Sequence, residues 1–115
     1  MSESNAPTTR PSSPGAPLVS ELAHDADMLD LVEMYVAELP TRVDAIQSAL
    51  RQGDLDTLTR LSHQMKGSAG GYGFPQITDA ARAVELDCKA KADLAKITDE
   101  VRALADLCAR ARAKA

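Results

Sequence analysis

The sequence has few of the residues that build sheet sandwiches or membrane spans. Its 115 residues include no tryptophan, two tyrosines and one phenylalanine, so aromatic residues make up only 3%. Alanine and leucine must therefore do most of the packing, which favours closely packed helices over a sheet sandwich rich in aromatic and β-branched residues. No apolar run reaches the length of a membrane span, and the N-terminus lacks an apolar signal core. We therefore expect a cytoplasmic protein.

Cysteine and positive charge are also scarce. The two cysteines, Cys88 and Cys108, are too few for a disulfide framework, and their places in the predicted helices are too far apart for pairing. The formal net charge of −4 provides no basic surface for nucleic acid. His24 has no second histidine or cysteine beside it, so we expect neither a metal site nor a cofactor.

The remaining sequence predicts one all-α domain behind a tail. Residues 1–17 hold four of the six prolines and predict a disordered tail. Over residues 18–115, apolar residues recur at spacings of three and four. This pattern predicts helices from Asp27 to Gly53, from Asp54 to Gly73, from Pro75 to Cys88, and from Asp93 through Leu94 to Cys108. Short connections make neighbouring helices antiparallel, which predicts an up-down four-helix bundle. Pro40 predicts a kink or a break in the first helix, and a short extra helix near residues 18–23 is a further option.

One stretch, "SHQMKGSAGGYG" at residues 62–73, holds four of the six glycines and one of the two histidines. A glycine cluster beside a lysine raises the question of a nucleotide-binding loop. The phosphate loop needs Gly-Lys-Ser/Thr after a strand, whereas this order is Lys66-Gly67-Ser68 and no strand precedes it. The dinucleotide fingerprint needs a third glycine three places after the pair, where Gln76 stands. We therefore expect no ATP site.

Helical geometry gives the stretch another meaning. At about 100° per residue, Ser62 and Met65 share the core face, whereas His63 turns towards solvent with Lys66 and Gly67 beside it. A glycine inside a helix costs roughly 1 kcal/mol relative to alanine, and an exposed face gives no packing reason for one. An outward imidazole nucleophile, a cation and a bare surface suit a phosphoryl group brought by a partner protein. Glu85, on the next antiparallel helix at a similar height, could accept a hydrogen bond from the ring.

These residues match a known pattern. The segment "HQMKGSAGGYGFPQITDAARAVE", residues 63–85, resembles the signature of histidine phosphotransfer (HPt) domains. That signature has a histidine, two residues, Lys-Gly, small residues, a glycine at ten places, an apolar residue at fourteen and an acid or amide at twenty-two. The matching residues are His63, Lys66, Gly67, Ser68, Ala69, Gly73, Ile77 and Glu85. The resemblance extends over roughly residues 25–110, and the doublet Gly70-Gly71 departs from it and predicts a weakened helix end.

The resemblance implies a phosphocarrier of a two-component phosphorelay rather than an enzyme. His63 would be the phosphoacceptor, Lys66 would stabilise the phosphoryl group, Gly67 would permit close docking, and Glu85 would orient the ring. The partners would be response-regulator receiver domains and a hybrid histidine kinase. The receiver would supply Mg²⁺ and most catalytic groups, so the chain itself would need no cofactor and could act as a monomer.

Two other classes of function remain open. One is an adaptor or inhibitor that docks receivers without transferring phosphate, although such a module would not need His63. The other is a small hydrolase with His63 as its base, although the sequence lacks the paired acid, second nucleophile or metal cluster that such chemistry requires.

Overall fold

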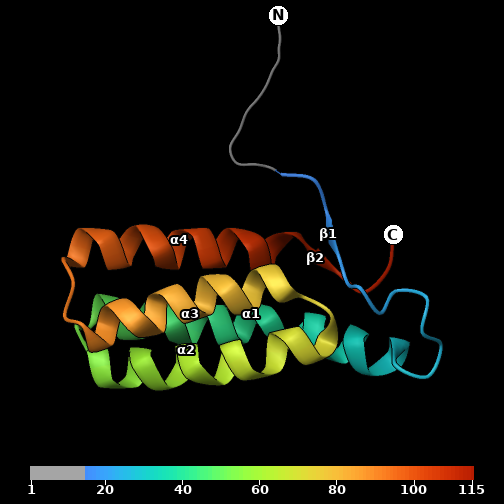
Figure 1. The fold of residues 1–115 in the computed structure, drawn as a ribbon, viewed down its shortest axis with the longest axis horizontal. Helices are drawn as coiled ribbons and strands as arrows, with labels where there is room; N and C mark the ends of the chain where they lie inside the picture. Colours follow the sequence, from blue (N-terminus) through green and yellow to red (C-terminus); the bar gives the residue numbers. More distant parts are fainter. Residues whose placement is uncertain (1–14) are drawn as a thin grey trace, which may run out of the picture.

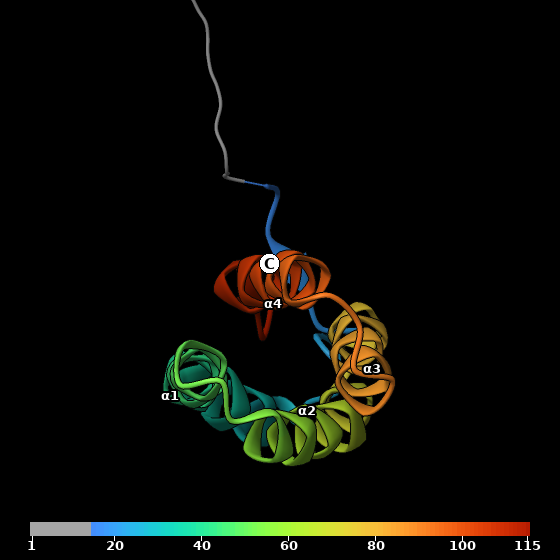
Figure 2. The same ribbon diagram turned by 90° about the vertical axis from the view of Figure 1, so that its left-hand side faces the viewer.

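Four antiparallel helices form a bundle in the computed structural model, which describes residues 15–115. The helices are α1 (Leu29–Arg51), α2 (Leu55–Ala69), α3 (Pro75–Lys89) and α4 (Leu94–Arg110). They lie side by side along one direction (Figure 1), and the end-on view shows them following one another around the bundle in sequence order (Figure 2). The predicted all-α four-helix bundle is therefore confirmed. None of the helices in this part of the chain is both long and apolar enough to cross a membrane.

The turns between helices are built by the residues that the sequence places there. Gly53 has φ +68° after α1, and Gly73 has φ +89° before α3, a left-handed conformation that glycine adopts without strain. Asp54 caps α2 by accepting a hydrogen bond from the backbone N–H of Thr57 at 3.1 Å. Pro75 occupies the start of α3, where its missing N–H costs nothing. These tight turns make α2 and α3 antiparallel neighbours.

Pro40 lies inside α1 without ending it, because α1 is continuous from Leu29 to Arg51.

The doublet Gly70-Gly71 lies where α2 ends. Helix α2 ends at Ala69 and passes into a short 3₁₀ helix, η1 (Gly70–Tyr72). A side chain at residue 70 would meet the hydroxyl oxygen of Thr78 at 3.2 Å, and that hydroxyl donates to the backbone carbonyl of Lys66 at 3.0 Å. Glycine here therefore lets α3 approach the end of α2 closely.

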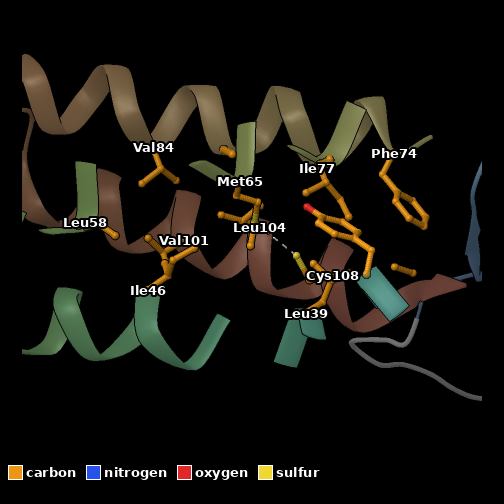
Figure 3. Packing of buried hydrophobic residues seen from close by; sticks show 14 of the residues in the cluster. Leu39, Ile46, Leu58, Met65, Phe74, Ile77, Val84, Val101, Leu104 and Cys108 are labelled. Atoms are coloured by element: carbon orange, nitrogen blue, oxygen red, sulfur yellow. Dashed lines mark hydrogen bonds between the residues drawn. The ribbon is translucent and has the colours of Figure 1, made fainter. Parts of the chain in front are cut away.

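The core is aliphatic along most of its length and aromatic at one end (Figure 3). Its largest fully buried hydrophobic side chains are Val32, Leu39, Ile46, Leu58, Met65, Phe74, Ile77, Val84, Ile97, Val101 and Leu104. At the aromatic end the Tyr35 ring stacks on Tyr72, with centroids 4.3 Å apart, and the Tyr35 hydroxyl hydrogen-bonds with Ser68 at 2.7 Å. Cys88 and Cys108 are free, buried thiols, as predicted, and burial raises the pKa of Cys108 to about 12.

The option of a short helix over residues 18–23 is wrong. Leu18–Val19 form strand β1, which pairs in parallel with β2 (Ala111–Arg112), and turns follow over residues 21–24. The backbone N–H of Glu21 donates to Gly73, and the Ser20 hydroxyl donates to the carbonyl of Tyr72. Because backbone and side-chain groups here bond to distant parts of the chain, they do not form the local ladder that a helix needs.

The start of α1 and the exposure of Leu94 differ from the sequence-based expectations. Helix α1 begins at Leu29, so Asp27 lies in the preceding turn and does not cap it. Leu94 belongs to the apolar stripe of the predicted last helix, which would bury it, but it is the first residue of α4 and is 60% exposed. Residues 1–14 of the predicted tail lie outside the described residues. Within residues 15–17, the last part of the predicted tail, the carbonyl of Ala16 accepts a hydrogen bond from Arg110 at 3.1 Å.

Candidate functional site

His63 stands on the outer surface of the bundle in the middle of α2. Its side chain is 64% exposed, whereas its neighbour Ser62 and the later residue Met65 are buried. The difference follows from helical geometry, because one residue along α2 turns the side chain by about 100° away from the core. The imidazole is therefore accessible to another macromolecule.

Gly67 lies one turn beyond His63, on the same exposed side of α2. A side chain built at this glycine would meet nothing within 4 Å, and its φ is not left-handed. Neither packing nor backbone conformation within the bundle therefore requires a glycine at this position. The missing side chain leaves the helix backbone open beside the imidazole.

Glu85 links the imidazole to α3. The turn at Gly73 reverses the chain, so Glu85 reaches the height of His63, and its Oε2 lies 2.8 Å from Nδ1 of the ring. The Glu85 side chain is only 2% exposed, which is unusual for a carboxylate unless it is paired. The pairing explains how a glutamate can be buried beside an exposed histidine.

Two lysines complete the pairing of this carboxylate. Lys66 Nζ lies 2.7 Å from Oε1, and Lys89 Nζ lies 3.1 Å from Oε2. The hydrogen bond from Lys66 is the largest influence on the pKa of Glu85, burial opposes it, and hydrogen bonds from Lys89 and His63 add to it. Together they lower the pKa of Glu85 from 4.5 to about 2. The carboxylate is therefore ionised throughout the neutral range.

The ionised carboxylate determines which nitrogen of the ring can act as a nucleophile. An ionised glutamate only accepts hydrogen bonds, so Nδ1 of His63 must be the donor in their contact. In a neutral imidazole with hydrogen on Nδ1, the lone pair is on Nε2. The nitrogen on the other side of the ring from Glu85 is therefore the one available to an incoming electrophile.

The structure thus brings His63, Lys66 and Glu85 together, with Gly67 beside them. Lys66 differs from the sequence-based picture in one respect: it is 27% exposed and held against Glu85 rather than extended freely into solvent. The sequence-based interpretation missed Lys89. Its spacing of four residues from Glu85 on one helix could have identified it, since residues i and i+4 are neighbours on a helix surface.

The rest of the described chain offers no competing centre. His24 is exposed in the turns before α1. Within residues 15–115, no group of three or more histidine, cysteine, aspartate or glutamate side chains is arranged to hold a metal ion. The cluster around His63 is therefore the site from which a function can be argued.

Comparison with known proteins gives one family match. The family model described as "Hpt domain" matches residues 30–114, which covers all four helices almost completely and includes the whole cluster. Searches of curated proteins and of solved structures gave no match. A family match over most of the chain, with an exposed histidine on the second helix of a four-helix bundle, settles the classification. The chain belongs to the Hpt domain family, whose members take part in histidine phosphotransfer in phosphorelays.

Proposed function

We propose that this protein carries phosphoryl groups between receiver domains through His63. The histidine would take the group from an aspartyl phosphate of one receiver and pass it to the aspartate of another. The observation that carries the proposal is the pairing of Nδ1 with buried Glu85, because it leaves Nε2 as the exposed nucleophile of a 64% exposed ring.

The transfer step can be written from these atoms. The Nε2 lone pair attacks phosphorus, the N–P bond forms, and the P–O bond to the receiver aspartate breaks, so the aspartate leaves as a carboxylate. The proton on Nδ1 stays between the ring and Glu85, whose negative charge stabilises the positive charge that develops on the imidazole. Delivery to the next receiver is the same step in reverse, with its aspartate as nucleophile.

The other two residues have supporting roles in this proposal. Lys66 would offset negative charge on the transferring oxygens. Gly67 would let the receiver bring its aspartyl phosphate up to the backbone of α2, because the space beside it is open. Neither role requires a nucleotide site on this chain, since the phosphoryl group arrives already activated as an acyl phosphate.

The experiment is incubation with a radiolabelled phosphorylated receiver, followed by separation of the two proteins. We expect label on the wild-type chain that is stable to base and labile to acid, as a phosphoramidate bond is. His63→Gln should carry no label, whereas the matched variant His24→Gln should be labelled like the wild type.

The adaptor interpretation predicts a different result from the same experiment. A docking module would bind the receiver but acquire no label, in the wild type as in His63→Gln. Label that persists in His63→Gln would place the acceptor elsewhere and refute the proposal.

The proposal also includes the setting in which the carrier works. A hybrid histidine kinase with its own receiver would supply the phosphoryl group, and the chain would act as a cytoplasmic monomer. Sedimentation at micromolar concentration tests the oligomeric state, and a dimer that buries His63 would contradict this part of the proposal.

A further inference from the structure

Lys89 contacts the same carboxylate oxygen as the imidazole and has no role in the proposed function so far. Its ammonium lies 3.1 Å from Oε2 of Glu85, and the same oxygen lies 2.8 Å from Nδ1 of His63. One carboxylate oxygen therefore joins the lysine to the ring. The inference that follows rests on the proposed function, because it concerns the state in which His63 carries a phosphoryl group.

The charges of the cluster show why a second lysine matters. Glu85 carries one negative charge and is paired with Lys66 through Oε1. With Lys66 alone, the two charges would cancel, and the neutral ring would stand in a site with no net attraction for an anion. Lys89 leaves the cluster with one net positive charge, which favours a phosphoryl group that bears about −1.5 to −2 charges at neutral pH.

Lys66 and Lys89 also differ in the direction from which they approach Glu85 and in their exposure to solvent. Helices α2 and α3 are antiparallel, Lys66 follows His63 along α2, and Lys89 follows Glu85 along α3. The two ammonium groups therefore approach the carboxylate from opposite directions along the bundle. Lys89 is 59% exposed and Lys66 is 27% exposed, so Lys89 has more freedom to leave the carboxylate and turn outward.

We propose that Lys89 is a second phosphoryl-binding residue of this site. When Nε2 of His63 carries the phosphoryl group, the Lys89 ammonium leaves Oε2 of Glu85 and contacts the phosphoryl oxygens. Oε2 then binds the Nδ1–H of the ring without a competitor, so the ring is held more firmly in the phosphorylated state. Lys66 keeps Glu85 in place through Oε1.

The test uses the small phosphodonor phosphoramidate, so no receiver is needed. Wild type, Lys89→Met and the matched control Lys91→Met are phosphorylated, and the second ionisation of the phosphoryl group is followed by ³¹P NMR against pH. A nearby cation favours the dianion, so losing it should weaken the second ionisation constant by about two- to fivefold, the effect of a screened charge pair. Lys91→Met, which removes an equal charge in the turn after α3, should match the wild type. The ¹⁵Nζ resonance of Lys89 should also shift when wild type is phosphorylated.

The outcomes separate this inference from the proposed function. A phosphorylated wild type with identical ³¹P titrations in all three proteins, and an unmoved Lys89 resonance, overturns the role of Lys89 and leaves the carrier intact. If phosphoramidate and phosphorylated receivers both fail to label His63, the proposed function itself fails. A purely structural role for Lys89 would change the thermal midpoint of Lys89→Met without changing the ionisation of the phosphoryl group, and would also overturn the inference.

Discussion

Replacement of Glu85 by glutamine tests how strongly this carboxylate holds the cluster together. The substitution keeps the shape of the side chain and removes its charge, so the contacts with His63, Lys66 and Lys89 lose their ionic character. The drop in the pKa of Glu85 from 4.5 to about 2 corresponds to roughly 3 kcal/mol of stability without further screening. Since His63 and Lys89 are more than half exposed, solvent weakens their share, and we expect a loss of about 1–2 kcal/mol at pH 7.

The difference in stability between wild type and Glu85→Gln depends on pH. A carboxylate whose pKa is lower in the folded than in the unfolded protein stabilises the fold fully above its unfolded pKa. This contribution disappears as pH falls from 4.5 towards 2. The gap between wild type and Glu85→Gln should therefore be largest near neutral pH and should close as the solution becomes acidic.

Urea unfolding followed by far-UV circular dichroism, at several pH values, measures this gap. Asp99→Asn is a matched control, because Asp99 is 78% exposed and its nearest cation, Arg102, lies 3.8 Å away. That control should change the free energy of unfolding by less than about 0.5 kcal/mol. The reasoning is refuted if Glu85→Gln is as stable as wild type at pH 7, or if its deficit stays constant between pH 5 and pH 3.

The remaining predictions concern the neighbouring residues and α4. Gly67→Gln should reduce receiver affinity by about tenfold and raise thermal stability, because glutamine is the better helix former by roughly 0.5–1 kcal/mol and a side chain at this position meets nothing within 4 Å. Calorimetry of binding and of unfolding measures the two effects. Unchanged receiver affinity would show that Gly67 has no docking role. Lys66→Ala should leave the fold intact and slow phosphotransfer by about three- to tenfold, the effect of losing a screened charge contact. An unchanged rate in a single-turnover transfer assay would show that Lys66 does not contact the phosphoryl group. Burial, with the Asp87 carboxyl beside it, raises the pKa of Glu100 to about 7, and Oε1 of Glu100 is buried without a hydrogen-bond partner. The folded protein then binds more protons at Glu100 than the unfolded chain between pH 4.5 and 7, so this residue lowers stability as pH rises. Glu100→Gln should flatten that decline in pH-dependent thermal unfolding, and an unaltered slope contradicts the assignment.

The sequence predicted the helices well because each carries its own apolar stripe and its own turn residues. Asp54, Gly53 and Gly73 act within a few residues of their positions, so their roles follow from local chemistry. Strand β1 could not be found this way, because Leu18 and Val19 pair with residues more than ninety positions away. Two residues provide no periodicity, and only the folded bundle brings Leu18–Val19 beside Ala111–Arg112.

The candidate site also has some features that a single helix determines and others that depend on packing between helices. The outward direction of His63 and the bare surface at Gly67 follow from the geometry of a single helix. The burial of Glu85 and its contacts with His63 and Lys66 depend on how closely α3 packs against α2, which no spacing within one helix determines. Lys89 is different, because its spacing of four residues from Glu85 on α3 could have been read from the sequence.

The most direct measurement is ¹⁵N–³¹P NMR of the protein labelled with ¹⁵N in its histidine rings, after transfer from a phosphorylated receiver. We expect the phosphorus to couple to Nε2 of His63, with Nδ1 still protonated and bound to Glu85. Coupling to Nδ1, or phosphorus attached to any residue other than His63, would contradict the account.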